Sequence, residues 1–190
     1  FDKWNWVRED VSPDATSSQL INHWQIDMPP LPVERSDAIV VGTVTSGSAF
    51  LSNDLTGVYS EFSVNVNEWL KGESLKPKLI ADLCVQRPGG RVLYPTGKIL
   101  QYMVAGQGMP RLKGKYIFFL THHPPSGVFH ILTAYEIVKG RIHAIDGKGK
   151  SKMAGYNFAT YDEYTEPAFL TELKEAIESK NRKSRRVPNP

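Results

Sequence analysis

The chain has 190 residues, of which 41% are hydrophobic and 11% aromatic, and this composition predicts a globular protein with a substantial core. Its longest apolar runs, Ala38 to Val41 and Tyr116 to Leu120, are far shorter than the roughly 20 residues of a membrane-spanning helix, so no such helix is predicted. Five of the 23 Lys and Arg residues lie between positions 180 and 186; the other 18 are balanced by 20 Asp and Glu residues. The body of the protein is therefore close to neutral.

Residues 1–35 are expected to form an N-terminal arm. A capping signal at Thr16-Ser17-Ser18 predicts a short helix after it, and the run from Met28 to Pro32 predicts extended polyproline structure. Because three tryptophans expose too much apolar surface to stay in water, we expect the arm to pack back onto the domain. They are Trp4, Trp6 and Trp24.

The stretch from Ser36 to Gly72 predicts two long antiparallel strands and the loop between them. The first, Ala38 to Val44, is almost wholly apolar and contains Gly42, as expected of a strand buried on both faces and bent at a barrel corner. The second alternates apolar and polar residues, which predicts one buried and one solvated face. The apolar set is Phe62, Val64 and Val66, and the polar set is Glu61, Ser63, Asn65 and Asn67.

Further short strands are expected at 78–85, 91–94, 99–104, 115–121, 128–133, 135–138 and 141–145. Pro95-Thr96-Gly97 suits the turn of a hairpin between two of them. Seven or eight short strands separated by turn signals predict a small barrel or sandwich. We expect one shared core made of Ile39, Val41, Phe62, Val64, Val66, Leu83, Ile117, Phe119 and Ile131.

A C-terminal helix is expected from Glu166 to Ser179, because apolar residues recur there at helical spacing and Pro167 suits a first turn. The fold class is therefore all-β with minor α: a small OB-like antiparallel β-barrel at residues 36–146, with the arm before it. Residues 147–179 form a loop and an amphipathic helix packed on the barrel. Residues 180–190 form a basic tail that lacks the apolar residues to fold alone.

The succession of SDAIVVGTV, YSEFSVNVNEWLKG, a glycine-rich hairpin and MPRLKGKYIFFL resembles the OB-like barrels of the netrin-like class, which includes tissue inhibitors of metalloproteinases. It is more similar to a group of uncharacterised bacterial extracytoplasmic proteins. The resemblance covers roughly residues 36–145 and implies a periplasmic or secreted protein, with which a first residue of Phe1 agrees. Those inhibitors act through an N-terminal cysteine, and here no cysteine precedes Cys84, so the resemblance assigns no functional residue.

Candidate chemistry in the sequence is sparse. His122 and His130 lie on successive strands and are the weak candidates for a metal site, against the alternative of exposed loop histidines. Gly149-Lys150-Ser151 resembles the end of a phosphate-binding loop, but Ala144 stands where its first glycine belongs. Cys84 lies inside a strand, which favours a small packed residue over a nucleophile. The acidic residues show no spacing that indicates acid–base catalysis.

Two excursions from the barrel, the loop from Ser46 to Val58 and the hairpin from Arg87 to Tyr102, are the predicted binding regions. They carry aromatic and Arg side chains typical of interfaces, namely Arg87, Arg91, Tyr94, Tyr102, Phe50 and Tyr59. The alternative for Phe50 and Tyr59 is that they close one end of the core.

These observations predict a non-catalytic binding or protein-interaction module with no cofactor and no metal. One alternative is a binder of single-stranded nucleic acid or oligosaccharide, although the near-neutral body disfavours nucleic acid. The other is an enzyme whose site assembles from loops around His122 and His130.

Overall fold

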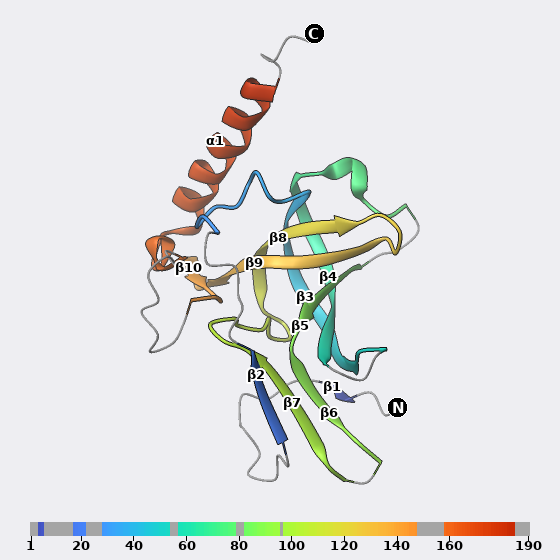
Figure 1. The fold of residues 1–190 in the computed structure, drawn as a ribbon. Helices are drawn as coiled ribbons and strands as arrows, with labels where there is room; N and C mark the ends of the chain where they lie inside the picture. Colours follow the sequence, from blue (N-terminus) through green and yellow to red (C-terminus); the bar gives the residue numbers. More distant parts are fainter. Residues whose placement is uncertain are drawn as a thin grey trace.

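The computed structural model describes residues 28–53, 57–78, 82–95, 97–147 and 158–180 in full, and the backbone alone at 4–5, 17–21 and 181–184. Within these residues the chain forms ten strands and one α-helix (Figure 1). The strands are β1 (Trp4–Asn5), β2 (Ser17–Ile21), β3 (Ala38–Leu51), β4 (Val58–Lys71), β5 (Leu83–Pro88), β6 (Gly90–Leu93), β7 (Ile99–Val104), β8 (Lys115–His123), β9 (Val128–Val138) and β10 (Arg141–Ala144), and the helix is α1 (Glu166–Ser184).

Five strands close into a ring. Each of β3, β4, β5, β9 and β8 pairs with the next, and β8 pairs back onto β3. The spatial order β8-β3-β4-β5 is that of a Greek key. A five-stranded Greek-key barrel is the architecture of an OB-like fold. The predicted all-β barrel is confirmed, but it is not wholly antiparallel, because a closed ring with an odd number of strands needs at least one parallel pair. That pair is β5 with β9, joined through Val85–Phe129 and Gln86–His130.

The apolar strands β3 and β8 contribute side chains to two separate cores. The prediction of one shared core is therefore wrong. Phe62, Val64, Leu83 and Ile131 lie inside the barrel together with alternate residues of β3 and β8 such as Val40 and Phe118. The intervening residues point out of the barrel, because side chains alternate along a strand. Ile39, Val41, Ile117 and Phe119 therefore form an outer core with Phe169, Leu173 and Ile177 of α1.

The C-terminal helix covers this outer core and is longer than predicted. It continues to Ser184, so the expected tail does not begin at residue 180. Between Pro167 in the first turn and Pro188 the sequence has no proline or glycine, and the Lys and Arg residues near position 180 are good helix formers. Part of the arm packs beside the helix, since Met28 and Val33 are buried in the same outer core. Among the described residues, no helix is long and apolar enough to span a membrane.

A second sheet lies at the other end of the molecule from α1 (Figure 1). The predicted hairpin is confirmed as β6 and β7, with Leu93 opposite Ile99 and a positive φ of 80° at Gly97. The helix expected after Thr16 is wrong, because residues 17–21 form β2 and pair in parallel with β7. A capping signal depends only on neighbouring residues in the sequence. It therefore does not indicate that the edge of β7 is free to form hydrogen bonds with the backbone of residues 17–21. The side chains of the three N-terminal tryptophans lie outside the described residues.

Two predicted boundaries also change. β3 continues to Leu51, so most of the expected loop from Ser46 to Val58 is an extension of the β3–β4 hairpin beyond the barrel. The third strand begins at Leu83, and residues 79–81 lie outside the described residues. The bend expected at Gly42 agrees with a register shift between Val41 and Gly42.

Candidate binding surface

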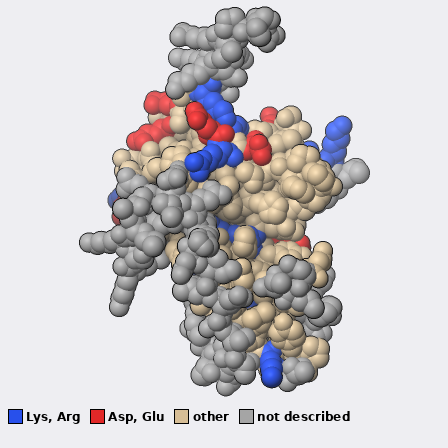
Figure 2. Space-filling view, viewed as in Figure 1, with Lys and Arg blue, Asp and Glu red and all other residues tan. Residues whose placement is uncertain are grey.

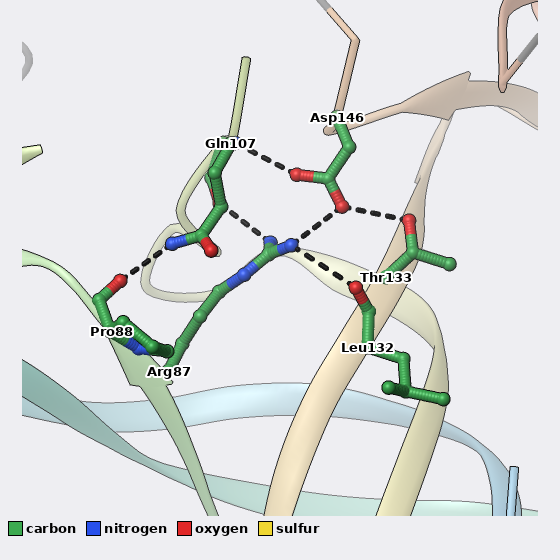
Figure 3. Close-up of polar contacts among 7 residues, drawn as sticks. Arg87, Pro88, Gln107, Leu132, Thr133 and Asp146 are labelled. Carbon is green, nitrogen blue, oxygen red and sulfur yellow. Dashed lines mark hydrogen bonds and ion pairs between the residues drawn. The ribbon is translucent and has the colours of Figure 1, made fainter. Parts of the chain in front are cut away.

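Arg87 is not on the surface. Its side chain is fully buried and forms an ion pair of 2.6 Å with the fully buried carboxylate of Asp146 (Figure 3). Because β5 alternates, Arg87 points to the inside of the barrel next to Val85 rather than outwards. A residue buried in this way cannot contact a partner directly, so its predicted place in a binding hairpin is wrong.

The buried pair belongs to a wider hydrogen-bond network. Arg87 Nη1 donates to the Gly108 carbonyl oxygen (2.6 Å), and Asp146 accepts from the Gly108 amide (2.8 Å) and the Thr133 hydroxyl (2.7 Å). Burial raises the pKa of the Asp146 carboxyl, whereas the Arg87 charge and these donors oppose that rise. The network fastens the chain around Gly108 and Asp146 onto β5 and β9, and its role is to hold the barrel together.

The other predicted residues lie on different surfaces. Phe50 and Tyr59 stack at the outer side of the β3–β4 extension, with ring centroids 5.6 Å apart. Tyr102 lies on the opposite side, against the small cluster that buries Ala49, Val58 and Val92. Arg91 points to the other face of the hairpin from Val92, and its Nη2 lies 3.5 Å from Gln101 Oε1. Tyr94 closes the turn of the hairpin through its backbone. The structure therefore does not bring the six together.

A different surface gathers exposed polar groups. The outward side chains of β4 and of the β5 segment lie in register, with Glu61 opposite Gln86 and Ser63 opposite Cys84. This surface, here the β4–β5 face, consists of Tyr59, Glu61, Ser63, Asn65, Asp82, Cys84 and Gln86, all exposed or partly exposed. The Phe50 ring extends it at one end through the stack on Tyr59.

Hydrogen bonds hold the polar groups of the β4–β5 face in place. Gln86 Nε2 donates to Glu61 Oε1 at 2.7 Å. Asp82 accepts from the Thr45 hydroxyl at 2.7 Å and from Asn65 Nδ2 at 3.3 Å. These contacts join residues 17 to 37 positions apart in the chain. Sequence spacing alone therefore missed the grouping, although the alternation along β4 already indicated which side chains face outwards.

The face is acidic to neutral. It carries two carboxylates and no Lys or Arg. Partial burial and then Glu61 raise the pKa of the Tyr59 hydroxyl, and the same two causes raise the pKa of the Cys84 thiol. Cys84 is exposed rather than packed inside the sheet as predicted, because the odd positions of β5 are the ones that fill the barrel. A thiol whose pKa is raised is a poor nucleophile at neutral pH.

The histidines are arranged differently from the prediction. His122 turns toward the inside of the barrel and contacts the buried Phe129, with ring centroids 4.8 Å apart. His130 faces the outside and lies near His123 instead, with centroids 6.3 Å apart. His122 and His130, the weak candidates for a metal site, therefore do not face each other. In the part of the chain that the structure describes, no group of three or more His, Cys, Asp and Glu side chains could hold a metal ion.

No protein-family model, curated protein or solved structure matches this chain. The resemblance to netrin-like barrels accordingly stays a prediction.

Proposed function

We propose that the protein is a non-catalytic binding module and that the β4–β5 face, extended by the Phe50–Tyr59 stack, binds an oligosaccharide. The observation that carries the proposal is the continuous row of oriented polar groups that ends in a partly exposed aromatic stack. An extended chain of polar units fits such a row, since each unit meets a new side chain along the strand.

The chemistry of the side chains supports a sugar. Hydroxyl groups both donate and accept hydrogen bonds, and the face offers amides at Asn65 and Gln86 together with carboxylates at Glu61 and Asp82. The aromatic stack supplies a flat apolar surface for a ring. By analogy of fold, OB-like barrels bind oligonucleotides and oligosaccharides on the face of their second and third strands, which here are β4 and β5.

The charge of the face disfavours nucleic acid. Binding of a phosphate backbone depends on several Lys or Arg contacts, and the β4–β5 face has two carboxylates in their place. In the view of Figure 2 most of the coloured charged side chains lie at the end of the molecule that carries α1. The extracytoplasmic location expected from the resemblance agrees with an oligosaccharide ligand.

A protein partner is the second candidate, because a partly exposed aromatic pair is also typical of protein interfaces. The two candidates differ in their ligand but share the surface, so one set of variants serves both.

The test is an oligosaccharide array followed by calorimetry with the strongest binder. The double variant Tyr59→Ala/Gln86→Ala should bind at least about tenfold more weakly, a loss of about 1.4 kcal/mol. The matched control is Arg91→Ala/Tyr94→Ala on the hairpin, which should bind as the unaltered protein does. Circular dichroism confirms the fold of each.

Loss of binding in the hairpin control alone would contradict the assignment of the face. Binding of single-stranded DNA but of no glycan would contradict the assignment of the ligand. If no glycan binds and a protein captured from extracts is lost only with Tyr59→Ala/Gln86→Ala, the face stands and the oligosaccharide is replaced by the protein partner.

A further inference from the structure

We propose that His123 and His130 form a surface site for a divalent transition-metal ion. The site lies at the end of the barrel where β8 turns into β9, and it goes beyond the proposed oligosaccharide binding without depending on it.

The strand register brings the two imidazoles together. His123 pairs with Val128 and Thr121 pairs with His130, so the two histidines are diagonal neighbours on the outer face of antiparallel strands. Diagonal neighbours are within reach of long and aromatic side chains. The rings meet edge to face, with centroids 6.3 Å apart and planes at 78°. Both residues are exposed, so an ion has access from solvent.

The turn between the strands orients the first imidazole. The amides of Ser126 and Gly127 both donate to the His123 carbonyl oxygen, at 3.2 and 2.9 Å. The Ser126 hydroxyl lies 3.4 Å from that oxygen and 2.9 Å from His123 Nδ1. In the tautomer in which Nδ1 donates to the hydroxyl, Nε2 keeps a lone pair for the ion. A hydrogen bond that orients a ligating histidine through its other nitrogen is a general feature of metal sites.

The donor set decides the class of ion. Imidazole nitrogen suits Zn²⁺, Cu²⁺ and Ni²⁺, whereas Mg²⁺ and Ca²⁺ require oxygen ligands. Since no third ligating side chain joins the pair among the described residues, water completes the coordination shell. Positions held by water are open to an outside donor. Gln86 of the β4–β5 face is the register partner of His130, so such a donor would arrive at the border of that face.

The test is calorimetric titration of the full chain with ZnCl₂, with MgCl₂ as the reference ion. The unaltered protein should bind one Zn²⁺ and no Mg²⁺, and His123→Ala and His130→Ala should each abolish this binding. Ser126→Ala should weaken it about tenfold, as expected for loss of an orienting partner. The matched control is His143→Ala, since that histidine lies on β10 and has Glu163 as its neighbour at 3.5 Å.

Three results would overturn the site: no Zn²⁺ binding by the unaltered protein, undiminished binding in His123→Ala and His130→Ala, or equal binding of Mg²⁺. Because both residues are exposed, their variants should fold, and circular dichroism checks that they do. Oligosaccharide binding is measured separately in the absence of Zn²⁺, so failure of one proposal is distinguishable from failure of the other.

Discussion

Replacement of Asp146 by Asn should be the most damaging single polar substitution in the buried network. Asn keeps an oxygen for the Gly108 amide but removes the charge that balances Arg87, whose side chain is fully buried. Removing one partner of a buried ion pair costs about 3 to 5 kcal/mol, because the other charge stays uncompensated away from water. Since the free energy of unfolding of a small domain is about 5 to 15 kcal/mol in total, Asp146→Asn should remove a large fraction of it.

The measurement is urea unfolding followed by circular dichroism at neutral pH. Lys115 and Glu166 supply the matched control, since their ion pair has a similar length of 2.7 Å but both side chains are partly exposed, by 42% and 25%. Exposed pairs contribute about 0 to 1 kcal/mol, so Glu166→Gln should barely move the midpoint. Comparing the two variants separates the effect of burial from that of the ion pair.

The reasoning can also be tested through the partner residue. In the double variant Arg87→Met/Asp146→Asn no buried charge remains unpaired, so the combined loss should be smaller than the sum of the two single losses. A cost below about 1 kcal/mol for Asp146→Asn, or strictly additive losses in the double variant, would refute the idea that the pair is a buried structural unit.

Three further results are expected. Phe62→Ala and Phe119→Ala should each cost about 3 to 5 kcal/mol in urea unfolding, and their losses should add, since the two rings belong to separate cores; strong coupling would argue for one core. Gly42→Ala should cost about 1 to 3 kcal/mol, measured as a lower Tm, because the new Cβ would lie 2.5 Å from Val64 Cγ1; an unchanged Tm would show that β4 moves aside. Burial, and then a neighbouring lysine, lower the pKa of Lys71 from 10.5 to about 8, so the folded state binds fewer protons than the unfolded state between these values. The free energy of unfolding of the unaltered protein, relative to that of Lys71→Met, should therefore rise as pH increases from 8 to 10.5. A fall over that range would contradict the lowered pKa of Lys71.

The strands could be predicted because their signals are local. Alternation along residues 58–71 and the apolar runs at Ala38 and Tyr116 reflect how many faces of each strand are buried, and each appears within a few residues. The hairpin turn at Gly97 is likewise specified by its own backbone preference.

Contacts between distant segments could not be predicted in this way. Arg87 has the residue type of a surface contact, and only a carboxylate 59 positions away makes its burial tolerable. Residues 17–21 became a strand because the edge of β7 was available to pair with them.

Local patterns in the sequence thus predicted most of the strands, the amphipathic C-terminal helix and which side chains along each strand share a face. The closure of the ring, the division into two cores and the contact of His130 with His123 rather than His122 became apparent only in the folded chain. Strand register and ring closure depend on hydrogen bonds between segments far apart in the chain, and local patterns do not report these. A shift of one residue in such a pairing would turn every side chain of a strand to the other face.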